Sequence, residues 1–336
     1  MTWRPLALTL GDPAGIGPEI IVKAWRALAA EGPPFLVVGD AQALASAPTA
    51  SDLPIRTVGG AEQALNTFRQ ALPVLDLPLT TKVVAGQPNA SAAPQIVRWI
   101  ETAVGLALSG GVKGVVTAPI AKAPLYEAGF RFPGHTEFLA ELTAVTNQPG
   151  ARGPIMMLTA RDLRVALVTI HEPLGRVPAL LSVERIVNAG LVTAQALRRD
   201  FGIQKPRLAV AGLNPHAGES GGLGREEIEI IEPAVRALRD LGVETTGPHP
   251  ADSLFHEEAR ARYDAVLCQY HDQALIPVKM LDFWSGVNVT LGLPLVRTSP
   301  DHGTGFDIAG RGQARPDSLI AAINLADQIA NHRLQA

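Results

Sequence analysis

Three apolar runs in this chain, each short enough to be a buried β-strand, lead into a histidine. They are residues 163–170 before His171, residues 208–213 shortly before His216, and residues 265–268 shortly before His271. In an open α/β sheet, ligands bind beyond the carboxyl ends of the strands. Three strand ends that each offer an imidazole therefore predict one convergent site.

The rest of the chain alternates between similar runs and stretches in which apolar residues recur at helical spacing. The other strand-like runs are residues 6–10, 35–38 and 114–117, and the helical stretches include residues 19–28, 93–108 and 227–241. This alternation predicts βαβ units and a largely parallel sheet. Residues 41–92, rich in Ala, Pro and Thr, are expected to form peripheral connections and short strands.

Acids or tight-turn residues flank each of the three histidines, as in His171-Glu172-Pro173 and His271-Asp272. A single histidine after a strand is most often a loop or capping residue. Three in equivalent positions favour a catalytic divalent metal, because neutral imidazoles bind such ions and leave coordination positions open for a substrate. Zinc, cobalt, manganese and magnesium all stay open as the metal.

Composition limits the classes of function. With 336 residues, 47% of them hydrophobic and 18% charged, the chain can bury a large core in one or two domains. A net charge of -3, without a block of lysine or arginine, argues against a nucleic-acid partner. The single cysteine, Cys268, lies in an apolar run and fits core packing in a reducing cytoplasm. No apolar run approaches a membrane span, and residues 1–5 show no signal-peptide pattern, so we expect a cytoplasmic protein.

A glycine-rich turn, GDPAGIGPE at residues 11–19, follows the first strand-like run. Pro18 suits a first helical position, and Asp40 closes the second strand at about the distance expected of a ribose-binding acid. Gly11, Gly15 and Gly17 do not have the G-x-G-x-x-G spacing. We therefore favour a structural turn beside an active-site cleft over a Rossmann dinucleotide site.

Two further groups of residues suit an anion. His135 and Thr136 follow a Pro-Gly turn at the start of a helical stretch, where they either bind a substrate anion or act as a plain helix cap. Lys279 and Arg297 occur in apolar surroundings, where each needs an anionic partner, with Asn288 between them along the chain. A phosphate ester and an internal carboxylate both satisfy that need.

Five motifs follow one another along almost the whole chain: GDPAGIGPE (11–19), PGHTEF (133–138), NPHAGE (214–219), YHDQ (270–273) and SPDHGTGFDIAG (299–310). Together they closely resemble the 4-hydroxythreonine-4-phosphate dehydrogenase family of pyridoxal phosphate biosynthesis. The resemblance implies an isocitrate/isopropylmalate dehydrogenase-like fold, not a Rossmann fold, with two α/β/α subdomains around a cleft. By analogy, residues 1–125 with 290–336 form the first subdomain, on the nucleotide side, and residues 126–289 form the second, with the metal ligands and the dimer interface.

The resemblance also implies roles for individual residues. His171 and His216 of one subunit and His271 of its partner would hold the metal in a homodimer, with Asp252 and Asp272 supporting that site. The residues that match the family's phosphorylated-substrate ligands are His135, Thr136, Lys279, Asn288 and Arg297. We expect Asp272 to orient the neighbouring imidazole, while either Lys279 or a metal-bound water accepts the substrate's hydroxyl proton.

A coenzyme loop is implied at residues 302–310, which more loosely resemble the adenosine-binding loop of isopropylmalate and isocitrate dehydrogenases. His302, Gly303 and Asp307 would then contact NAD or NADP. The implied reaction is metal-assisted oxidation of 4-phosphooxy-L-threonine to 2-amino-3-oxo-4-phosphooxybutanoate, which decarboxylates to 3-amino-2-oxopropyl phosphate. The metal would serve both steps as a Lewis acid, and the phosphate contacts would position the substrate.

Other functions stay open from the sequence. A sister dehydrogenase acting on 4-phospho-D-threonate or 4-phospho-D-erythronate would keep the metal and phosphate groups. A phosphate acyltransferase of similar fold would need neither three histidines nor NAD. A binding module without catalysis would have no reason to combine three metal-ligating side chains with two phosphate-compatible cations.

Overall fold

The computed structural model describes residues 4–335, which cluster into two compact units. Unit 1 holds the described residues up to Thr146 together with Pro294–Asn331, and unit 2 holds Asn147–Leu293 and the described residues from His332 onward. The subdomain boundaries expected by analogy with the family lay near residues 125 and 290. Helix α6 (His135–Leu142), which carries His135 and Thr136, clusters with unit 1.

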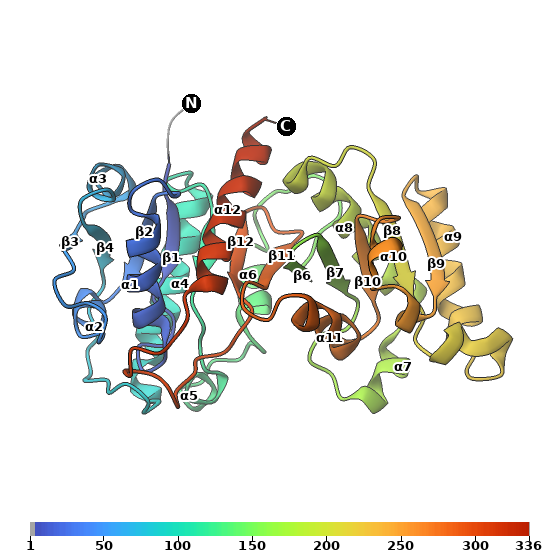
Figure 1. Ribbon diagram of the computed structural model, residues 1–336, viewed down its shortest axis with the longest axis horizontal. Coiled ribbons are helices and arrows are strands. Elements are labelled where there is room, and N and C mark those ends of the chain that lie inside the picture. Colours follow the sequence, from blue (N-terminus) through green and yellow to red (C-terminus); the bar gives the residue numbers. More distant parts are fainter. Residues whose placement is uncertain (1–3, 336) are drawn as a thin grey trace. The chain divides into compact units, whose positions relative to one another are not determined.

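Unit 1 contains a parallel sheet with helices packed on it (Figure 1). The strand order is β3-β4-β2-β1-β5-β12, with β1 Leu6–Thr9, β2 Phe35–Gly39, β3 Ile55–Thr57, β4 Leu72–Asp76, β5 Val115–Thr117 and β12 Arg297–Pro300. Its helices are α1 Gly17–Leu28, α2 Ala41–Ala45, α3 Ala61–Thr67, α4 Ala93–Leu108 with a 3-10 turn at Ala90–Ala92 before it, α5 Lys122–Glu127, α6, and most of α12 Asp317–Gln335. Strands β1, β2 and β5 are buried along their whole length, as expected of a parallel sheet covered on both faces.

Within unit 2 the strands run in mixed directions, in the order β11-β6-β7-β10-β8-β9. The strands are β6 Ile155–Ala160, β7 Leu163–Leu167, β8 Arg207–Ala211, β9 Glu244–His249, β10 Ala265–Cys268 and β11 Val287–Leu291. Its helices are α7 Val177–Leu180, α8 Val183–Phe201, α9 Glu232–Asp240, α10 Glu257–Arg260 and α11 His271–Leu281, with short turns at Leu174–Arg176, Pro215–Gly221, Glu227–Ile231 and Ala251–Ser253. The expected parallel pairing holds among β7, β10, β8 and β9, whereas β6 pairs antiparallel with both of its neighbours.

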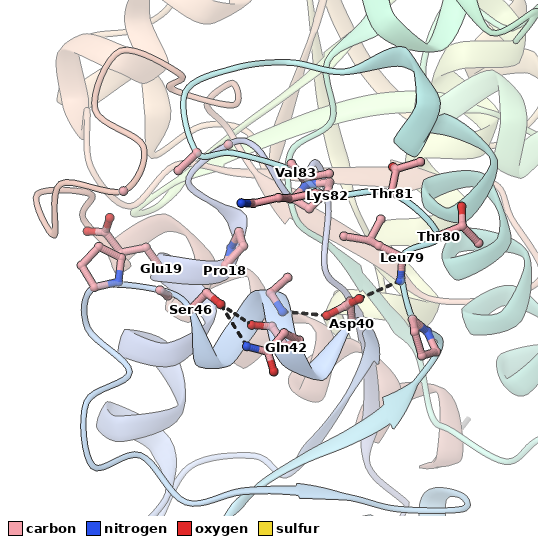
Figure 2. Close-up of a pocket in the computed structure, with 18 residues that line it drawn as sticks. Pro18, Glu19, Asp40, Gln42, Ser46, Leu79, Thr80, Thr81, Lys82 and Val83 are labelled. Atoms are coloured by element: carbon pink, nitrogen blue, oxygen red, sulfur yellow. Dashed lines mark hydrogen bonds between the residues drawn. The ribbon is translucent and has the colours of Figure 1, made fainter.

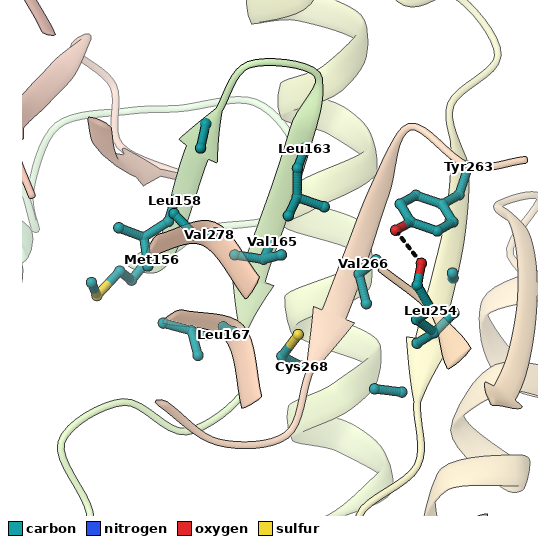
Figure 3. Packing of buried hydrophobic residues seen from close by; sticks show 14 residues of the cluster. Met156, Leu158, Leu163, Val165, Leu167, Leu254, Tyr263, Val266, Cys268 and Val278 are labelled. Atoms are coloured by element: carbon teal, nitrogen blue, oxygen red, sulfur yellow. Dashed lines mark hydrogen bonds between the residues drawn. The ribbon is translucent and has the colours of Figure 1, made fainter. Parts of the chain in front are cut away.

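The two faces of the unit 2 sheet are covered by different helices. Alternate residues of β6, β7 and β10, among them Leu158, Val165 and Cys268, form a buried cluster with Ala274 and Val278 of α11 (Figure 3). Helix α8 also packs on these strands. Because successive side chains of a strand point to opposite faces, the strand residues of this cluster all lie on the face that α11 covers. Cys268 is buried and forms no disulfide bond, as expected of a packing residue.

The stretch 41–92 is more ordered than its composition indicated, since it contains the helices α2 and α3 as well as the short strands β3, at the edge of the sheet, and β4, beside it. Asp40 is the N-cap of α2: its side chain accepts hydrogen bonds from the backbone N–H of Ala43 at 2.6 Å and of Leu79 at 2.7 Å (Figure 2). Asp40 is therefore a structural residue rather than a ribose acceptor. Across residues 4–335, no single helix is long and apolar enough to cross a bilayer. One pair of helical segments, Leu174–Leu180 and Val183–Phe201, is long and apolar enough only when the two are taken together, and they are bent by 93° at the break.

Candidate active site

His171, His216 and His271 all follow the carboxyl ends of three neighbouring parallel strands of unit 2, β7, β8 and β10. The rings of His171 and His271 lie close, with their centroids 5.6 Å apart and their planes inclined by 42°. Two imidazoles that share a tetrahedral ion, at ~2.1 Å from each nitrogen, have centroids roughly 5 Å apart. The pair therefore fits the chemistry of a shared divalent ion.

His216 lies on a strained turn. Residues 216–220 all have positive φ, with φ 52° at His216 and 45° at Glu219, a left-handed conformation that non-glycine residues adopt at a cost of about 1 kcal/mol each. Only Gly218 of the five takes it without strain, and a Cβ there would lie 2.6 Å from a carboxylate oxygen of Glu227. The turn presents the His216 ring to solvent, beside the Glu219 carboxylate at 3.1 Å.

Glu227 holds this turn in place. One oxygen of the buried carboxylate accepts the backbone N–H groups of Leu213 and Asn214, both at 2.7 Å, and the other accepts the Asn214 side-chain amide at 3.0 Å. Three charge-assisted hydrogen bonds thus fix the chain just before His216.

The predicted metal ligands are not all brought together within one chain. Across residues 4–335, no three His, Cys, Asp or Glu side chains are placed to hold a metal ion. His171 is near His271 of its own chain, whereas the family resemblance implied a pairing of His171 with His216. Asp272 contacts the His271 ring at 2.7 Å, as a group that orients an imidazole does, and Asp252 lies exposed in the turn Ala251–Ser253.

Buried glutamines that the sequence analysis missed join the three strand ends. The Gln273 amide donates to the Gly212 carbonyl at 2.7 Å, while its oxygen accepts the Gln269 backbone N–H at 2.7 Å. Gln269 donates in turn to the Ala211 carbonyl at 2.8 Å, and its own carbonyl accepts the Thr169 hydroxyl at 2.6 Å. A polar residue predicted at a buried strand end, such as Gln269 directly after Cys268, was the signal available in the sequence.

Unit 1 holds a second cluster, in which Arg297 begins β12 and is 3% exposed. Its guanidinium donates to the hydroxyl of Thr117, at the end of β5, at 2.7 Å. Burial lowers the pKa of Arg297 to about 10, and the nearby Glu137 carboxylate offsets part of that shift. A buried cation at a strand end suits recognition of a phosphate or carboxylate. Thr117 was not among the residues chosen from the sequence.

His135 and Thr136 begin helix α6, and the structure resolves one of the alternatives for them. The N-cap is Gly134, and no side chain caps this helix end, so neither residue is a plain cap. The Nε2 atom of His135 is buried, with no hydrogen-bond partner in the described chain. Burial, together with the positive charge of Arg297, lowers the pKa of His135 well below its usual value, so the ring is neutral.

The other two predicted substrate ligands belong to unit 2. Lys279 lies two turns along α11 from His271, with its ammonium 5.1 Å from the centre of the Phe283 ring. Asn288 lies on β11, and its side-chain oxygen is buried without a hydrogen-bond partner among residues 4–335. A buried amide oxygen of this kind needs a donor, which a bound substrate can supply.

The predicted coenzyme loop is joined to the glycine-rich turn. Thr304 accepts the backbone N–H of Ile16 at 2.9 Å. Buried Glu19 accepts the backbone N–H groups of Gly312 at 3.1 Å and Ala314 at 2.8 Å, and it pairs with Lys23 at 2.8 Å. The turn at residues 11–19 and the helix start after it are thus hydrogen-bonded to this loop and to the residues just beyond it. On the loop, His302 contacts the Gly303 carbonyl at 3.0 Å and Asp307 is exposed.

Solved structures identify the class of protein. The chain is similar to the crystal structure of 4-hydroxythreonine-4-phosphate dehydrogenase from Klebsiella pneumoniae, with 41% identity, a TM-score of 0.83, and coverage of 97% of this chain and 99% of that one. It is also similar to a terephthalate 1,2-cis-dihydrodiol dehydrogenase from Burkholderia xenovorans, with 31% identity, a TM-score of 0.64, and coverage of 97% and 98%. The class is an α/β dehydrogenase, and the expected fold class is confirmed.

The family follows from the sequence comparisons. The model of the pyridoxal phosphate biosynthetic protein PdxA matches residues 31–326. A curated 4-hydroxythreonine-4-phosphate dehydrogenase from Caulobacter vibrioides is 71% identical over 333 residues, which cover 99% of each chain. The chain belongs to the PdxA family of pyridoxal phosphate biosynthesis, which confirms the resemblance drawn from its five motifs.

Proposed function

We propose that this protein catalyses the NAD-dependent, divalent-metal-assisted oxidation of 4-phosphooxy-L-threonine. The product, 2-amino-3-oxo-4-phosphooxybutanoate, then loses CO2 to give 3-amino-2-oxopropyl phosphate. The observation that carries the proposal is the full-length, 71% identical relative that bears the name of this activity. The two clusters of chemistry-bearing residues at strand ends are in keeping with it.

The metal would be held by His171 and His216 of one subunit and His271 of its partner. In each chain these rings are exposed or half-exposed at the ends of neighbouring strands, so they are open to an ion. When bound, a divalent cation supplies Lewis acidity at the reacting hydroxyl and at the charge left by decarboxylation, while the nicotinamide takes up the hydride. Asp272 holds the His271 ring, and Asp252 is assigned a supporting part in the same site.

The residues assigned to the substrate phosphate, by their match to the family, are His135, Thr136, Lys279, Asn288 and Arg297. Arg297 offers a charged fork already oriented by Thr117, and the neutral His135 ring offers a buried nitrogen without a partner in the described chain. These contacts lie on groups that do not react, so they position the substrate. Lys279 is the candidate to accept the hydroxyl proton, and the coenzyme, NAD or NADP, would contact His302, Gly303 and Asp307.

A homodimer completes the proposal. Helix α11, which begins at His271, and the residues just after it expose large apolar side chains: Ile276, Met280, Phe283 and Trp284 are 67%, 80%, 60% and 50% exposed. Such a patch is typical of a protein interface. A second copy of the chain packed there would bring its own residues close to His271.

Turnover with defined substrates tests the proposal. NADH formation is followed with 4-phosphooxy-L-threonine, 4-phospho-D-threonate and 4-phospho-D-erythronate, before and after chelation and after adding back zinc, magnesium, cobalt or manganese. We expect the L-threonine phosphate to be preferred and chelation to abolish the reaction. The variant His216→Ala should lose metal-dependent turnover with its fold intact.

Each other outcome identifies a different enzyme. Preference for either D-configured phosphate would make the protein a sister dehydrogenase. Unchanged NADH formation after chelation would overturn the metal assignment. Acyl transfer to phosphate without any reduction of NAD would indicate a phosphate acyltransferase of similar fold.

A further inference from the structure

Glu219 lies three residues after His216 and turns its carboxylate toward that ring. Its Oε2 atom is 3.1 Å from Nδ1 of His216, which is the one side-chain hydrogen bond that Glu219 forms among the described residues 4–335. An ionised carboxylate can only accept a hydrogen bond, so Nδ1 carries the proton and the neutral ring keeps its lone pair on Nε2. His216 therefore presents Nε2 to an ion that approaches it.

The two other carboxylates of this region serve the backbone and side chain of Asn214 instead. Glu227 accepts two backbone N–H groups just before the turn, and Glu226 accepts the Asn214 side-chain amide at 2.8 Å. Neither forms a hydrogen bond with the His216 ring in the described part of the chain. The contact with the imidazole is thus made by Glu219, whereas Glu226 and Glu227 fix the chain around it.

The turn that brings Glu219 to His216 is not stabilised by their contact. Four non-glycine residues between positions 216 and 220 have positive φ, at a cost of about 1 kcal/mol each. The side chains of His216 and Glu219 are 68% and 65% exposed, and a charged contact in that setting contributes roughly 0 to 1 kcal/mol. The rest of the fold therefore imposes the turn. Strain of this kind is typical of functional sites.

His271 carries the same arrangement as His216. Asp272 lies 2.7 Å from Nδ1 of its ring, so two candidate ligands at different strand ends each have a carboxylate on Nδ1. A carboxylate in that place fixes the tautomer and the orientation of the ring and makes the other nitrogen a stronger ligand. His216 and Glu219 also line a cavity of about 540 Å³ in unit 2, so water and ions can reach the pair.

We infer that Glu219 is a positioning residue for the metal: it holds the His216 ring through Nδ1 so that Nε2 faces the divalent ion. The assignment of His216 as a ligand rests on the proposed function. Glu219 acts through the ring and does not contact the ion, as Asp272 does at His271. Loss of such a group usually costs about 10-fold to 100-fold in metal affinity.

The tautomer of His216 in the metal-free, full-length protein tests the contact without any turnover. It is measured by ¹⁵N NMR of histidine-labelled protein at about pH 8.5, well above the usual histidine pKa of about 6.5. Wild type should show the Nδ1–H form at His216, whose signals are assigned by their loss in His216→Ala. Glu219→Ala should move the ring toward the Nε2–H form, because the hydrogen bond that selects the tautomer is gone. An unchanged tautomer would overturn the inference.

Calorimetric titration of the metal-free protein with Zn²⁺ supplies the second readout. Glu219→Ala should bind Zn²⁺ at least about tenfold more weakly than wild type, with the melting temperature of the metal-free protein unchanged. Glu219→Gln should lie between the two, because its amide oxygen still accepts from Nδ1 but carries no charge. The matched control is Glu229→Ala, which removes an exposed carboxylate of unit 2 that pairs with Arg225 and should leave Zn²⁺ affinity unchanged.

The absorption spectrum of bound Co²⁺ separates positioning from ligation. Glu219→Ala saturated with Co²⁺ should retain the wild-type spectrum, because the ligand set is the same. A changed spectrum would make Glu219 a metal ligand and overturn the inference, as would wild-type Zn²⁺ affinity in Glu219→Ala. If wild type binds neither ion, the metal of the proposed function is disproved, while the His216 tautomer still decides whether Glu219 holds the ring.

Discussion

Gln273 donates a hydrogen bond from its side-chain amide to the backbone carbonyl of Gly212 at 2.7 Å. The bond joins the first turn of α11, which begins at His271, to the end of β8, four residues before His216. Two of the three candidate metal ligands are therefore fixed relative to each other by an amide that touches neither ring. Groups that orient metal ligands in this way usually contribute about 10-fold to 100-fold in metal affinity.

Replacing Gln273 with leucine should therefore weaken Zn²⁺ binding by at least about tenfold, because the loss of the amide leaves the Gly212 carbonyl and the Gln269 N–H without their partner. The measurement is a calorimetric Zn²⁺ titration. Gln195→Leu is the matched control. Like Gln273, the side chain of Gln195 accepts one backbone N–H, that of Ala151, and donates to one carbonyl, that of Pro149. These two partners lie on the loop before β6 and not at the histidine strand ends. Equal losses of affinity in the two variants would contradict the role given to Gln273.

Thr117 orients Arg297, so its hydroxyl should matter for substrate affinity. Thr117→Val keeps the side-chain volume but removes the hydroxyl oxygen that accepts from Arg297 at 2.7 Å. Because Arg297 is buried, water cannot replace that partner of the guanidinium. We expect KM for the phosphorylated substrate to rise about tenfold, a loss of ~1.4 kcal/mol, with kcat changed less than about twofold. Thr117→Ser, which retains the hydroxyl, should restore most of the affinity. If Thr117→Val and Thr117→Ser have the same KM for the phosphorylated substrate, the hydroxyl does not position Arg297.

The strands that carry the sites could be predicted because burial alone decides them. β1, β2, β5 and β10 match the expected apolar runs to within about one residue, since a parallel strand covered on both faces must be continuously apolar. The expected helix at residues 227–241 was only partly right: Glu227–Ile231 forms a π-helical turn. There Glu227 turns inward to bind the backbone at residues 213 and 214, a long-range contact that periodicity cannot register.

The residues of the candidate site also fall into those that the sequence could predict and those that it could not. His271 could be chosen because it closely follows the carboxyl end of a predicted strand, and Arg297 because a charge in an apolar stretch needs an anionic partner. Their supports could not, because Gln273 and Thr117 are ordinary polar residues until the fold buries them against a specific carbonyl or guanidinium. The left-handed turn at residues 216–220 was likewise missed, since only Gly218 among the five has a preference for positive φ.

His135 should make the stability of the protein depend on pH. Its pKa is held well below the usual 6.5 by burial and by Arg297, so the folded ring stays neutral while the unfolded ring takes up a proton. Above about pH 6.5 the ring is neutral in both states, and the free energy of unfolding is not reduced by His135. As the pH falls below about 6.5, protonation of the unfolded ring lowers the free energy of unfolding by up to ~1.4 kcal/mol per pH unit, until the folded pKa is reached. The relevant comparison is the free energy of unfolding in urea at about pH 7.5 and about pH 5.5.

Between these two pH values, wild type should lose about 1 kcal/mol more than His135→Gln, which is neutral throughout. The control His256→Gln changes an exposed histidine and should follow wild type. An identical pH dependence for wild type and His135→Gln would mean that His135 accepts a proton in the folded protein.

The arrangement of the metal ligands between subunits can be decided by mixing two inactive variants, because the two pairings predict opposite results. If His171 and His216 of one subunit meet His271 of the partner, a hybrid of His171→Ala and His271→Ala subunits has one complete set of ligands. If His171 and His271 of one chain serve the same ion together with His216 of the partner, as the 5.6 Å spacing of the two rings allows, neither set in that hybrid is complete. The resemblance to the family favours the first arrangement, so we expect co-refolded mixtures to recover up to about a quarter of wild-type turnover, since half of randomly paired dimers are hybrids with one intact site. The control is a mixture of His216→Ala and His271→Ala subunits, which either arrangement should rescue. Activity in the control but not in the first mixture would show that His171 and His271 of one chain bind the ion together.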